Sequence, residues 1–337
     1  MRCWAFFFVG LVSATLMAPA ASADLLGIDV SKWQASVNWN AMANAGVDFG
    51  FARATIGTND NDEYFAQNMN GARAAGIPIG PYHYAHPESF MNPLSAPVKQ
   101  DAVNEANDFV DRIKPYYDNY PGSYLRPVLD VEELPSNTEV NTTAEQRTYL
   151  SAWIKDFNNV VQDRLGVDVI LYSNGYYAST FYTPDLAAFD LWFAKPTGSP
   201  NSSPPTSSNM GIWNDWVFWQ YSWTGNVGGE NPLDLNTFRG TEADLNAYLV
   251  GYEEPVTGDY NGDGVVNAAD YTVWRDTYLA FGAWPADGNS NGVVDLGDYD
   301  LWAADYGKQV ATAVGVPEPL SLMLLTVGLA TAASHRR

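Results

Sequence analysis

The segment Arg126-Pro-Val-Leu-Asp130-Val-Glu132-Glu133 places two carboxylates two residues apart at the end of a short apolar run. The run is typical of a buried β-strand, and side chains at positions i and i+2 of a strand point to the same face. We therefore expect Asp130 and Glu132 to project together. The charge on one raises the pKa of the other, so one can stay protonated as a general acid while its neighbour is anionic. The spacing alone also fits a turn-capping Asp130 and a surface ion pair at Glu132.

Outward from this segment, short apolar runs alternate with amphipathic stretches of helical length between Asp24 and about Tyr252. Strands are predicted at 47–53, 77–83, 127–131 and 167–173, and helices at 63–75, 98–114 and 143–165. Strands that alternate with helices favour βα units around a parallel sheet, and roughly 230 residues suit a barrel. The predicted fold class is therefore α/β. In such barrels ligands meet the C-terminal strand ends, where Asp130 and Glu132 lie.

The first 23 residues have the layout of a secretory signal peptide. Arg2 precedes an apolar run from Cys3 to Met17, and Ala21-Ser-Ala23 offers a small-residue cleavage site. A membrane anchor is the alternative, but it requires about 20 apolar residues. The single cysteine of the chain, Cys3, lies in this segment, so we expect a mature protein without disulfides.

The composition supports a large core and an acidic surface. Of the 337 residues, 46% are hydrophobic and 14% aromatic, which is enough to fill such a core. The formal net charge of −22 argues against nucleic acid as a partner, because phosphates would be repelled. The same acidity favours cation binding.

An internal repeat follows a short linker at 253–258. The segment Asp259-Tyr-Asn-Gly-Asp-Gly-Val-Val-Asn-Ala-Ala-Asp270 recurs 28 residues later as Asp287-Gly-Asn-Ser-Asn-Gly-Val-Val-Asp-Leu-Gly-Asp298. Each copy has oxygen-bearing side chains at positions 1, 3, 5, 9 and 12, glycine at position 6 and a backbone carbonyl at position 7, as calcium loops do. The predicted ligands of two structural Ca²⁺ ions are Asp259, Asn261, Asp263, Val265, Asn267 and Asp270, and then Asp287, Asn289, Asn291, Val293, Asp295 and Asp298.

The two loops do not match a full EF-hand pair. Aspartate replaces the usual glutamate at position 12, and one helix-like stretch follows each loop. The pattern resembles a type I dockerin, which implies a small α-helical calcium-binding module at 253–310 and a possible cohesin-like partner. Some dockerins occur outside cellulosomes, so the partner stays open. The alternative is a pair of acidic turns that bind nothing.

The C-terminal segment at 311–337 resembles a PEP-CTERM sorting signal. Val316-Pro-Glu-Pro-Leu320 leads into an apolar stretch and a basic end, His335-Arg-Arg337. The resemblance implies removal by an exosortase-type enzyme and delivery to the surface or extracellular matrix of a bacterium. A plain C-terminal anchor is the alternative, although about 14 apolar residues are few for a membrane helix.

Seven motifs, spread in order over 24–252, resemble glycoside hydrolase family 25. They are Gly27-Ile-Asp29-Val-Ser-Lys-Trp33-Gln34, Phe51-Ala-Arg-Ala-Thr-Ile-Gly57, Ala75-Gly-Ile-Pro-Ile-Gly-Pro-Tyr82-His83, Pro127-Val-Leu-Asp130-Val-Glu132, Leu171-Tyr172-Ser-Asn174, Leu191-Trp192-Phe-Ala194 and Trp219-Gln220-Tyr-Ser222. A tyrosine that often follows Leu-Trp-x-Ala in the family is replaced here by Lys195-Pro196.

This resemblance implies a modified TIM-type β/α barrel with muramidase activity, which needs no catalytic cofactor and cuts the β-1,4 bond between N-acetylmuramic acid and N-acetylglucosamine in peptidoglycan. Glu132 corresponds to the proton donor. Asp130 corresponds to the residue that stabilises the substrate's 2-acetamido group, whose carbonyl oxygen attacks the anomeric carbon. Asp29 and Asp234 correspond to further site acids. Carboxylates suit this reaction because an oxocarbenium-like positive charge develops.

The motifs also place four candidate substrate-binding residues, Tyr82, Tyr172, Trp192 and Gln220, at strand ends. Aromatic rings offer flat apolar faces to sugars, although most aromatic residues in such a chain belong to the core. Asp29 and Asp234 also fit ordinary turn positions. Two other functions stay open: a non-catalytic glycan-binding or scaffold protein, and a hydrolase of other N-acetylated glycans. Retention of both Asp130 and Glu132 favours an enzyme.

Overall fold

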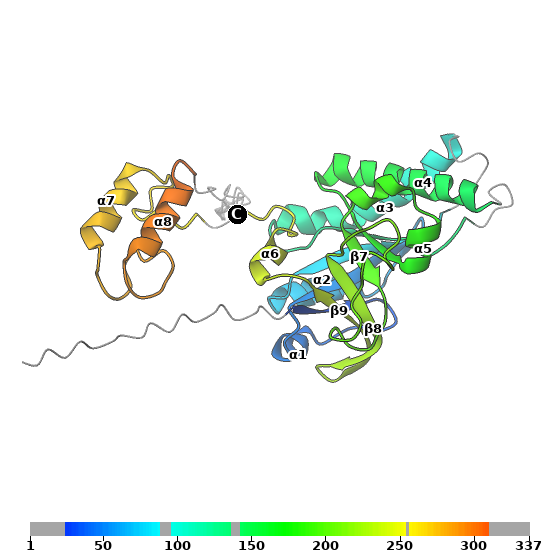
Figure 1. The fold of residues 1–337 in the computed structure, drawn as a ribbon, viewed down its shortest axis with the longest axis horizontal. Helices are drawn as coiled ribbons and strands as arrows, with labels where there is room; N and C mark the ends of the chain where they lie inside the picture. Colours follow the sequence, from blue (N-terminus) through cyan, green and yellow to red (C-terminus); the bar gives the residue numbers. More distant parts are fainter. Residues whose placement is uncertain (1–23, 88–95, 136–141, 254–255, 310–337) are drawn as a thin grey trace, which may run out of the picture. The chain divides into compact units, whose positions relative to one another are not determined.

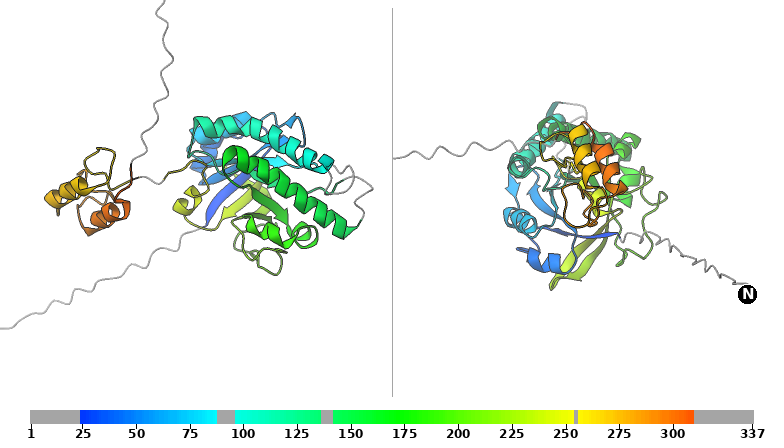
Figure 2. Two further views of the ribbon diagram at one scale, coloured as in Figure 1. Left: turned by 90° about the horizontal axis from the view of Figure 1, so that it is seen from above. Right: turned by 90° about the vertical axis from the view of Figure 1, so that its left-hand side faces the viewer.

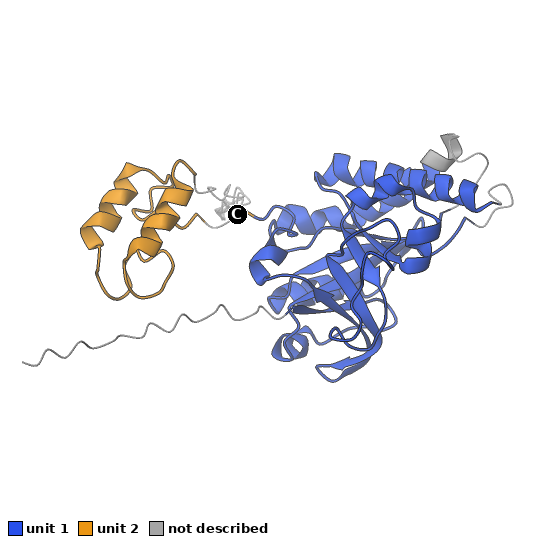
Figure 3. Cartoon of the chain, in the orientation of Figure 1, with its two compact units in different colours: residues 1–252 blue, residues 253–337 orange. Residues whose placement is uncertain are grey.

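The computed structural model describes residues 24–87, 96–135, 142–253 and 256–309. The predicted signal peptide and sorting signal lie outside the described residues. Two compact units divide after Tyr252, beside the predicted linker (Figure 3), and each is described by itself. Over the described ranges, no helix is long and apolar enough to cross a membrane.

A nine-stranded sheet forms the centre of the first unit (Figure 1). Its strands are β1 (Leu25–Val30), β2 (Phe49–Ile56), β3 (Asp60–Asn61), β4 (Ile79–Tyr84), β5 (Val128–Asp130), β6 (Ile170–Asn174), β7 (Leu191–Ala194), β8 (Phe218–Val227) and β9 (Glu230–Phe238). The order is β1-β9-β8-β7-β6-β5-β4-β2-β3, and β1 also pairs with β2. This last pairing closes the sheet into a barrel, with the short β3 as an extension. The predicted α/β barrel is confirmed.

Strand β9 departs from the expected parallel sheet, because it runs antiparallel to both β8 and β1. Its direction follows from the connection before it: only Gly228 and Gly229 separate β8 from β9, and both have positive φ. A two-residue turn with left-handed residues makes a tight hairpin, whereas a parallel crossover needs a dozen residues or more. This hairpin is the modification of the β/α barrel.

Most helices of the first unit pack on the outside of the barrel, whereas Leu245 of the last one belongs to the core inside it. The helices of this unit are α1 (Trp39–Asn44), α2 (Phe65–Ala74), α3 (Ala96–Asn119), α4 (Thr143–Leu165), α5 (Gly175–Thr180), the 3₁₀ helix η1 (Pro184–Ala188) and α6 (Glu242–Asn246). Helix α4 has the predicted bounds. It starts at a capping box between Thr142 and Glu145 and ends at Gly166, whose φ is +74°.

The long helices α3 and α4 lie side by side on the barrel, as the left view of Figure 2 shows. Polar contacts join them: the Trp153 indole donates to Asp101 Oδ2 at 2.7 Å, and the Arg164 guanidinium donates to Asn107 Oδ1 at 2.9 Å. Helix α3 continues past Pro115, where the sequence prediction ended it.

Two apolar cores lie on opposite faces of the sheet, as the alternation of a strand requires. One core fills the space between the strands and the helices. The other fills the barrel, with Phe49 and Phe51 of β2 at its centre. Gly27 and Gly80 flank these rings, and a Cβ atom at either position would lie within 3 Å of a ring carbon. The barrel interior is therefore packed at one end, which leaves its C-terminal end for a site.

The second unit contains α7 (Ala268–Thr277) and α8 (Leu296–Asp305), one after each repeat loop, as predicted. The repeats contact each other reciprocally. The Trp274 indole donates to the Asp295 carbonyl at 2.8 Å, and the Trp302 indole donates to the Asn267 carbonyl at 2.9 Å. These ties join the two repeats into one small core.

Candidate active site

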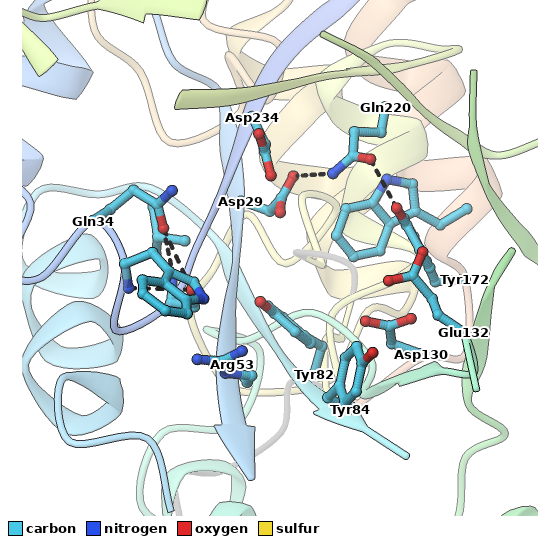
Figure 4. A pocket seen from close by; sticks show the side chains of 14 residues that line it. Asp29, Gln34, Arg53, Tyr82, Tyr84, Asp130, Glu132, Tyr172, Gln220 and Asp234 are labelled. Carbon is cyan, nitrogen blue, oxygen red and sulfur yellow. Dashed lines mark hydrogen bonds between the residues drawn. The ribbon is translucent and has the colours of Figure 1, made fainter. Parts of the chain in front are cut away.

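A pocket of about 180 Å³ opens at the C-terminal ends of the barrel strands (Figure 4). All four predicted acids and all four predicted substrate-binding residues line it. They are Asp29, Asp130, Glu132, Asp234, Tyr82, Tyr172, Trp192 and Gln220.

Strand alternation explains why these side chains meet. Asp130 ends β5, and Glu132 lies two residues further on the same side. Strand register brings in the other two acids, because Asp29 of β1 is the direct partner of Asp234 of β9. The β9 hairpin therefore supplies one acid of the site.

A hydrogen-bond network fixes Asp29. Its Oδ2 atom accepts from Gln220 Nε2 at 2.9 Å and from Asn236 Nδ2 at 2.8 Å. The Tyr172 hydroxyl donates to Gln220 Oε1 at 2.8 Å, and the Trp192 indole donates to Asn236 Oδ1 at 2.8 Å. Both amides are thereby oriented with their N–H groups toward Asp29.

Burial raises the pKa values of all four acids, because it disfavours the charged form. The pKa of Asp29 rises to about 6, although hydrogen bonds from Asn236 and Gln220 lower it. The pKa of Asp234 rises to about 8, through burial and then through the charge of Asp29. The pocket therefore retains protons near neutral pH.

Asp130 and Glu132 differ in their surroundings. Asp130 is buried, and none of the described residues donates a hydrogen bond to its Oδ1 atom. Burial and the charge of Glu132 raise the pKa of Asp130, while Arg53 lowers it. The pKa of Glu132 is raised by burial and then by the charge of Asp29. Asp130 therefore keeps one buried oxygen without a donor from the described residues, beside a second acid.

Sequence comparison then gives the family. A profile of "Glycosyl hydrolases family 25" matches residues 28–230. The chain belongs to this family. It is therefore a glycoside hydrolase, and the predicted family is confirmed.

Individual relatives support the same family assignment. Lysozyme M1 of Streptomyces globisporus is 33% identical over 241 residues, which cover 68% of this chain and 72% of the relative. An N,O-diacetylmuramidase of Arthroderma benhamiae is 24% identical over 238 residues, covering 65% and 88% of the two chains. The crystal structure of a bacterial lysozyme from Streptomyces coelicolor superposes with a TM-score of 0.53 at 31% identity, covering 68% of this chain and 98% of that one.

This family 25 site contains further residues that the sequence prediction did not assign to it: Val30, Ser31, Trp33, Gln34, Arg53 and Tyr84 line the pocket, and Asn236 contacts Asp29. Arg53 is buried and paired with Asp62, with Nη2 and Oδ2 3.1 Å apart. Arg53 follows Phe51 by two residues, and Asn236 follows Asp234 by two. The i, i+2 rule that predicted the Asp130–Glu132 pair also predicts the direction of these two side chains.

The three predicted aromatic residues lie in the pocket wall and are buried. Trp192 is 2% exposed and stacks on Phe51 with ring centroids 4.4 Å apart, while Tyr172 contacts its edge. Trp33, in contrast, is 79% exposed at the pocket, and offers its ring to solvent. Trp192 and Tyr172 orient the polar groups of the pocket through their hydrogen bonds.

Lys195, at the position where this chain departs from the family pattern, contacts the polar loop at 197–209. Its Nζ atom donates to the Ser203 carbonyl at 2.8 Å and to the Pro204 carbonyl at 3.3 Å. The lysine at this position therefore stabilises the polar loop at 197–209 through hydrogen bonds to its backbone.

Each repeat loop of the second unit turns at a left-handed glycine. Gly264 and Gly292, at position 6, have φ values of +89° and +86°. The buried Asp270 accepts from the backbone N–H groups of Asn261 and Asn267, at 3.0 and 2.8 Å, and Asp298 repeats this arrangement. Within the described residues, no three His, Cys, Asp or Glu side chains form a group that could hold a metal ion. The acidic side chains of the predicted Ca²⁺ ligand sets do not form such a group in the described residues, so the two calcium sites stay a prediction.

Proposed function

We propose that this family 25 enzyme is a secreted muramidase that hydrolyses the β-1,4 bond between N-acetylmuramic acid and N-acetylglucosamine in peptidoglycan. In this proposal Glu132 is the general acid and Asp130 assists the substrate's acetamido group. Asp29 and Asp234 add negative charge against the oxocarbenium-like transition state.

The observation that carries the proposal is the buried, unpartnered Asp130 Oδ1 atom beside Glu132. A buried acceptor without a partner costs free energy, so a ligand N–H that reaches it gains a strong, charge-assisted hydrogen bond. The N–H of a 2-acetamido group is such a donor. Its alignment would turn the acetamido oxygen toward the anomeric carbon, while Glu132 protonates the leaving oxygen.

Substrate binding would also place the proton. In the free pair, burial of both carboxyls and the charge of Glu132 acting on Asp130 favour a bound proton. An N–H donated to Asp130 stabilises its anion, as does nearby Arg53. The proton is then held by Glu132, where the general acid needs it.

The relatives support the choice of substrate: a lysozyme and an N,O-diacetylmuramidase match most of the barrel. The test measures reducing ends released from purified cell walls and from chitin oligosaccharides. We expect release from cell walls and a loss of about 10²–10⁴-fold in kcat for Glu132→Gln. Turnover of chitin oligosaccharides without turnover of cell walls would instead support a hydrolase of other N-acetylated glycans. If the unaltered protein bound these glycans without cleaving them, the result would support a glycan-binding or scaffold protein.

The proposal extends to the other segments. We assign 1–23 as the signal peptide, 253–310 as a dockerin-like module with two structural Ca²⁺ ions, and 311–337 as the PEP-CTERM signal. The module would bind a cohesin-like protein, and an exosortase-type enzyme would process the C-terminal end, at the cell surface or in the matrix. The repeat loops and their left-handed glycines support the calcium assignment. Asp259 and Asp287 would start the two ligand sets, and the ions would hold the loops together.

A further inference from the structure

We propose that Asn236, held by the Trp192 indole, is a positioning residue that fixes the proton of the Asp29–Asp234 pair on Asp234. The inference concerns the site of the proposed function and takes its catalytic meaning from it. It assigns a role to Asn236 and changes that of Trp192 from sugar contact to orientation of the network.

The direction of the Asn236 amide follows from donor chemistry. An indole N–H donates and cannot accept, so the atom of Asn236 that faces Trp192 at 2.8 Å must be the amide oxygen. The NH₂ group then faces Asp29 Oδ2, also at 2.8 Å. Asn236 and Trp192 are both buried, so water does not compete for these bonds. Without the indole donor, the amide can turn and present its oxygen to the carboxylate.

Asp29 and Asp234 are not equivalent acids. Asp29 Oδ2 accepts two amide N–H groups, and hydrogen bonds of this kind favour the charged form. Asp234 is its direct strand partner, and the two carboxyls point toward each other in the pocket (Figure 4). When two facing carboxyls hold one proton, the proton binds the carboxyl that accepts fewer hydrogen bonds from other groups. In this pair that carboxyl belongs to Asp234. Asp29 is thereby kept anionic beside Asp130 and Glu132.

The two amides of the network differ in a way that supplies a control. Gln220 Oε1 accepts from the Tyr172 hydroxyl at 2.8 Å and from the Trp223 indole at 2.9 Å. Loss of the Trp223 donor therefore leaves Gln220 oriented by Tyr172. In the described part of the chain, the corresponding bond to Asn236 Oδ1 comes from Trp192.

Other charged and titratable groups of the pocket act on the same pair. Asp130 and Glu132 lie across from it on the β5 side, Tyr82 belongs to β4, Tyr172 to β6, and Arg53 to β2. The two variants compared below, Trp192→Phe and Trp223→Phe, leave all of these residues unchanged in sequence, and each removes one donor to one amide. A shift in titration between variants therefore reports the amide orientation.

The experiment follows the carbon-13 signals of aspartate side-chain carboxyls against pH in the full chain, with Asp29 assigned from an Asp29→Asn variant. We expect Trp192→Phe, which keeps an aromatic ring against Phe51, to raise the titration midpoint of Asp29 by about one pH unit. Trp223→Phe should leave this midpoint where it is. Thermal unfolding of each variant checks that the barrel is folded.

Equal Asp29 midpoints in the unaltered enzyme and in Trp192→Phe would overturn the inference. Should Trp192→Phe not fold, Asn236→Leu removes the amide at similar volume and must raise the midpoint; an unshifted midpoint again overturns it. The NMR titration needs no turnover. Failure of the proposed function would show as absent cell-wall hydrolysis and is distinguishable. In an active enzyme, the acid limb of kcat/KM should move upward with the Asp29 midpoint.

Discussion

Asp29 and Asp234 face each other across neighbouring strands, so charging both costs free energy. This cost sets a pH dependence of stability. The folded-state pKa of Asp234, about 8, lies above its ordinary value of 3.8, so the folded state binds the proton more tightly. The resulting stability is complete below pH 3.8 and is lost as pH rises through about 8.

We predict that Asp234→Asn weakens this loss, because the amide keeps an N–H for Asp29 and carries no charge. Relative to the unaltered enzyme, its Tm at pH 9 should rise by about 3 °C, or about 1 kcal/mol, with little change at pH 4. Thermal unfolding at the two pH values measures this. Asp60→Asn, at an exposed position, is the control. A lower Tm for Asp234→Asn at pH 9 would contradict the prediction.

At the residue scale, alternation along one strand was enough to predict which side chains point the same way. The Asp130–Glu132 pair needed one strand and its end. The role proposed for Asn236 depends on two contacts between strands. Asn236 donates to Asp29, 207 residues away, and accepts from the Trp192 indole on a third strand. Its inward direction was predictable from Asp234, whereas its partners depend on barrel register.

At the element scale, α3 shows tertiary structure overriding a local signal. The predicted helix ended at Lys114, just before Pro115, and proline removes a backbone donor and usually ends or bends a helix. The helix continues to Asn119, and Tyr117 in this last part is buried, with its hydroxyl donating to the Leu125 carbonyl at 2.8 Å. A contact just before β5 therefore stabilises the helix end.

We predict that Tyr117→Phe destabilises the barrel by about 1–2 kcal/mol, because the buried Leu125 carbonyl loses its donor. Tyr116→Phe, on a half-buried neighbour, should cost about 0.5 kcal/mol or less. Urea unfolding of both variants measures the difference. Equal losses would show that the hydroxyl bond does not anchor the helix end.

The repeat loops give a second prediction at this scale. Calcium that binds the folded loops stabilises them by mass action, by about 2.7 kcal/mol at a hundred times the dissociation constant. We expect a chelator to lower the Tm of the second unit, and calcium to restore it. Asp263→Ala should weaken this response, whereas Asp276→Asn, on the exposed face of α7, should not. Identical melting with chelator and with calcium would remove the calcium assignment.

At the scale of the whole molecule, the net charge of −22 opposes an anionic substrate. Repulsion between exposed charges is screened over about 8 Å at physiological ionic strength and over about 30 Å at 0.01 M. We predict that kcat/KM on cell walls rises several-fold when the ionic strength is raised from about 0.01 M to the physiological value. Uncharged N-acetylglucosamine oligosaccharides, if bound or cleaved, should show little change. A flat profile on cell walls would exclude charge repulsion as a barrier to binding.

Chelation offers a molecule-wide check on the division into units. The pocket belongs to residues before Tyr252, and the repeat loops to residues after it. Cell-wall hydrolysis should therefore persist in chelator while the second unit loosens. Loss of activity that added calcium does not reverse would count against independent units.

The sequence by itself determined the alternation of strands and helices, the repeat at 28 residues and the acid pair at the end of β5. Each of these depends on neighbours within one element or one copy, where spacing alone fixes direction. Tertiary structure alone decided that β9 closes the barrel in reverse, that Asp29 meets Asp234, and that Trp192 orients Asn236. These depend on strand register and on hydrogen bonds between distant segments, which spacing along the chain does not encode.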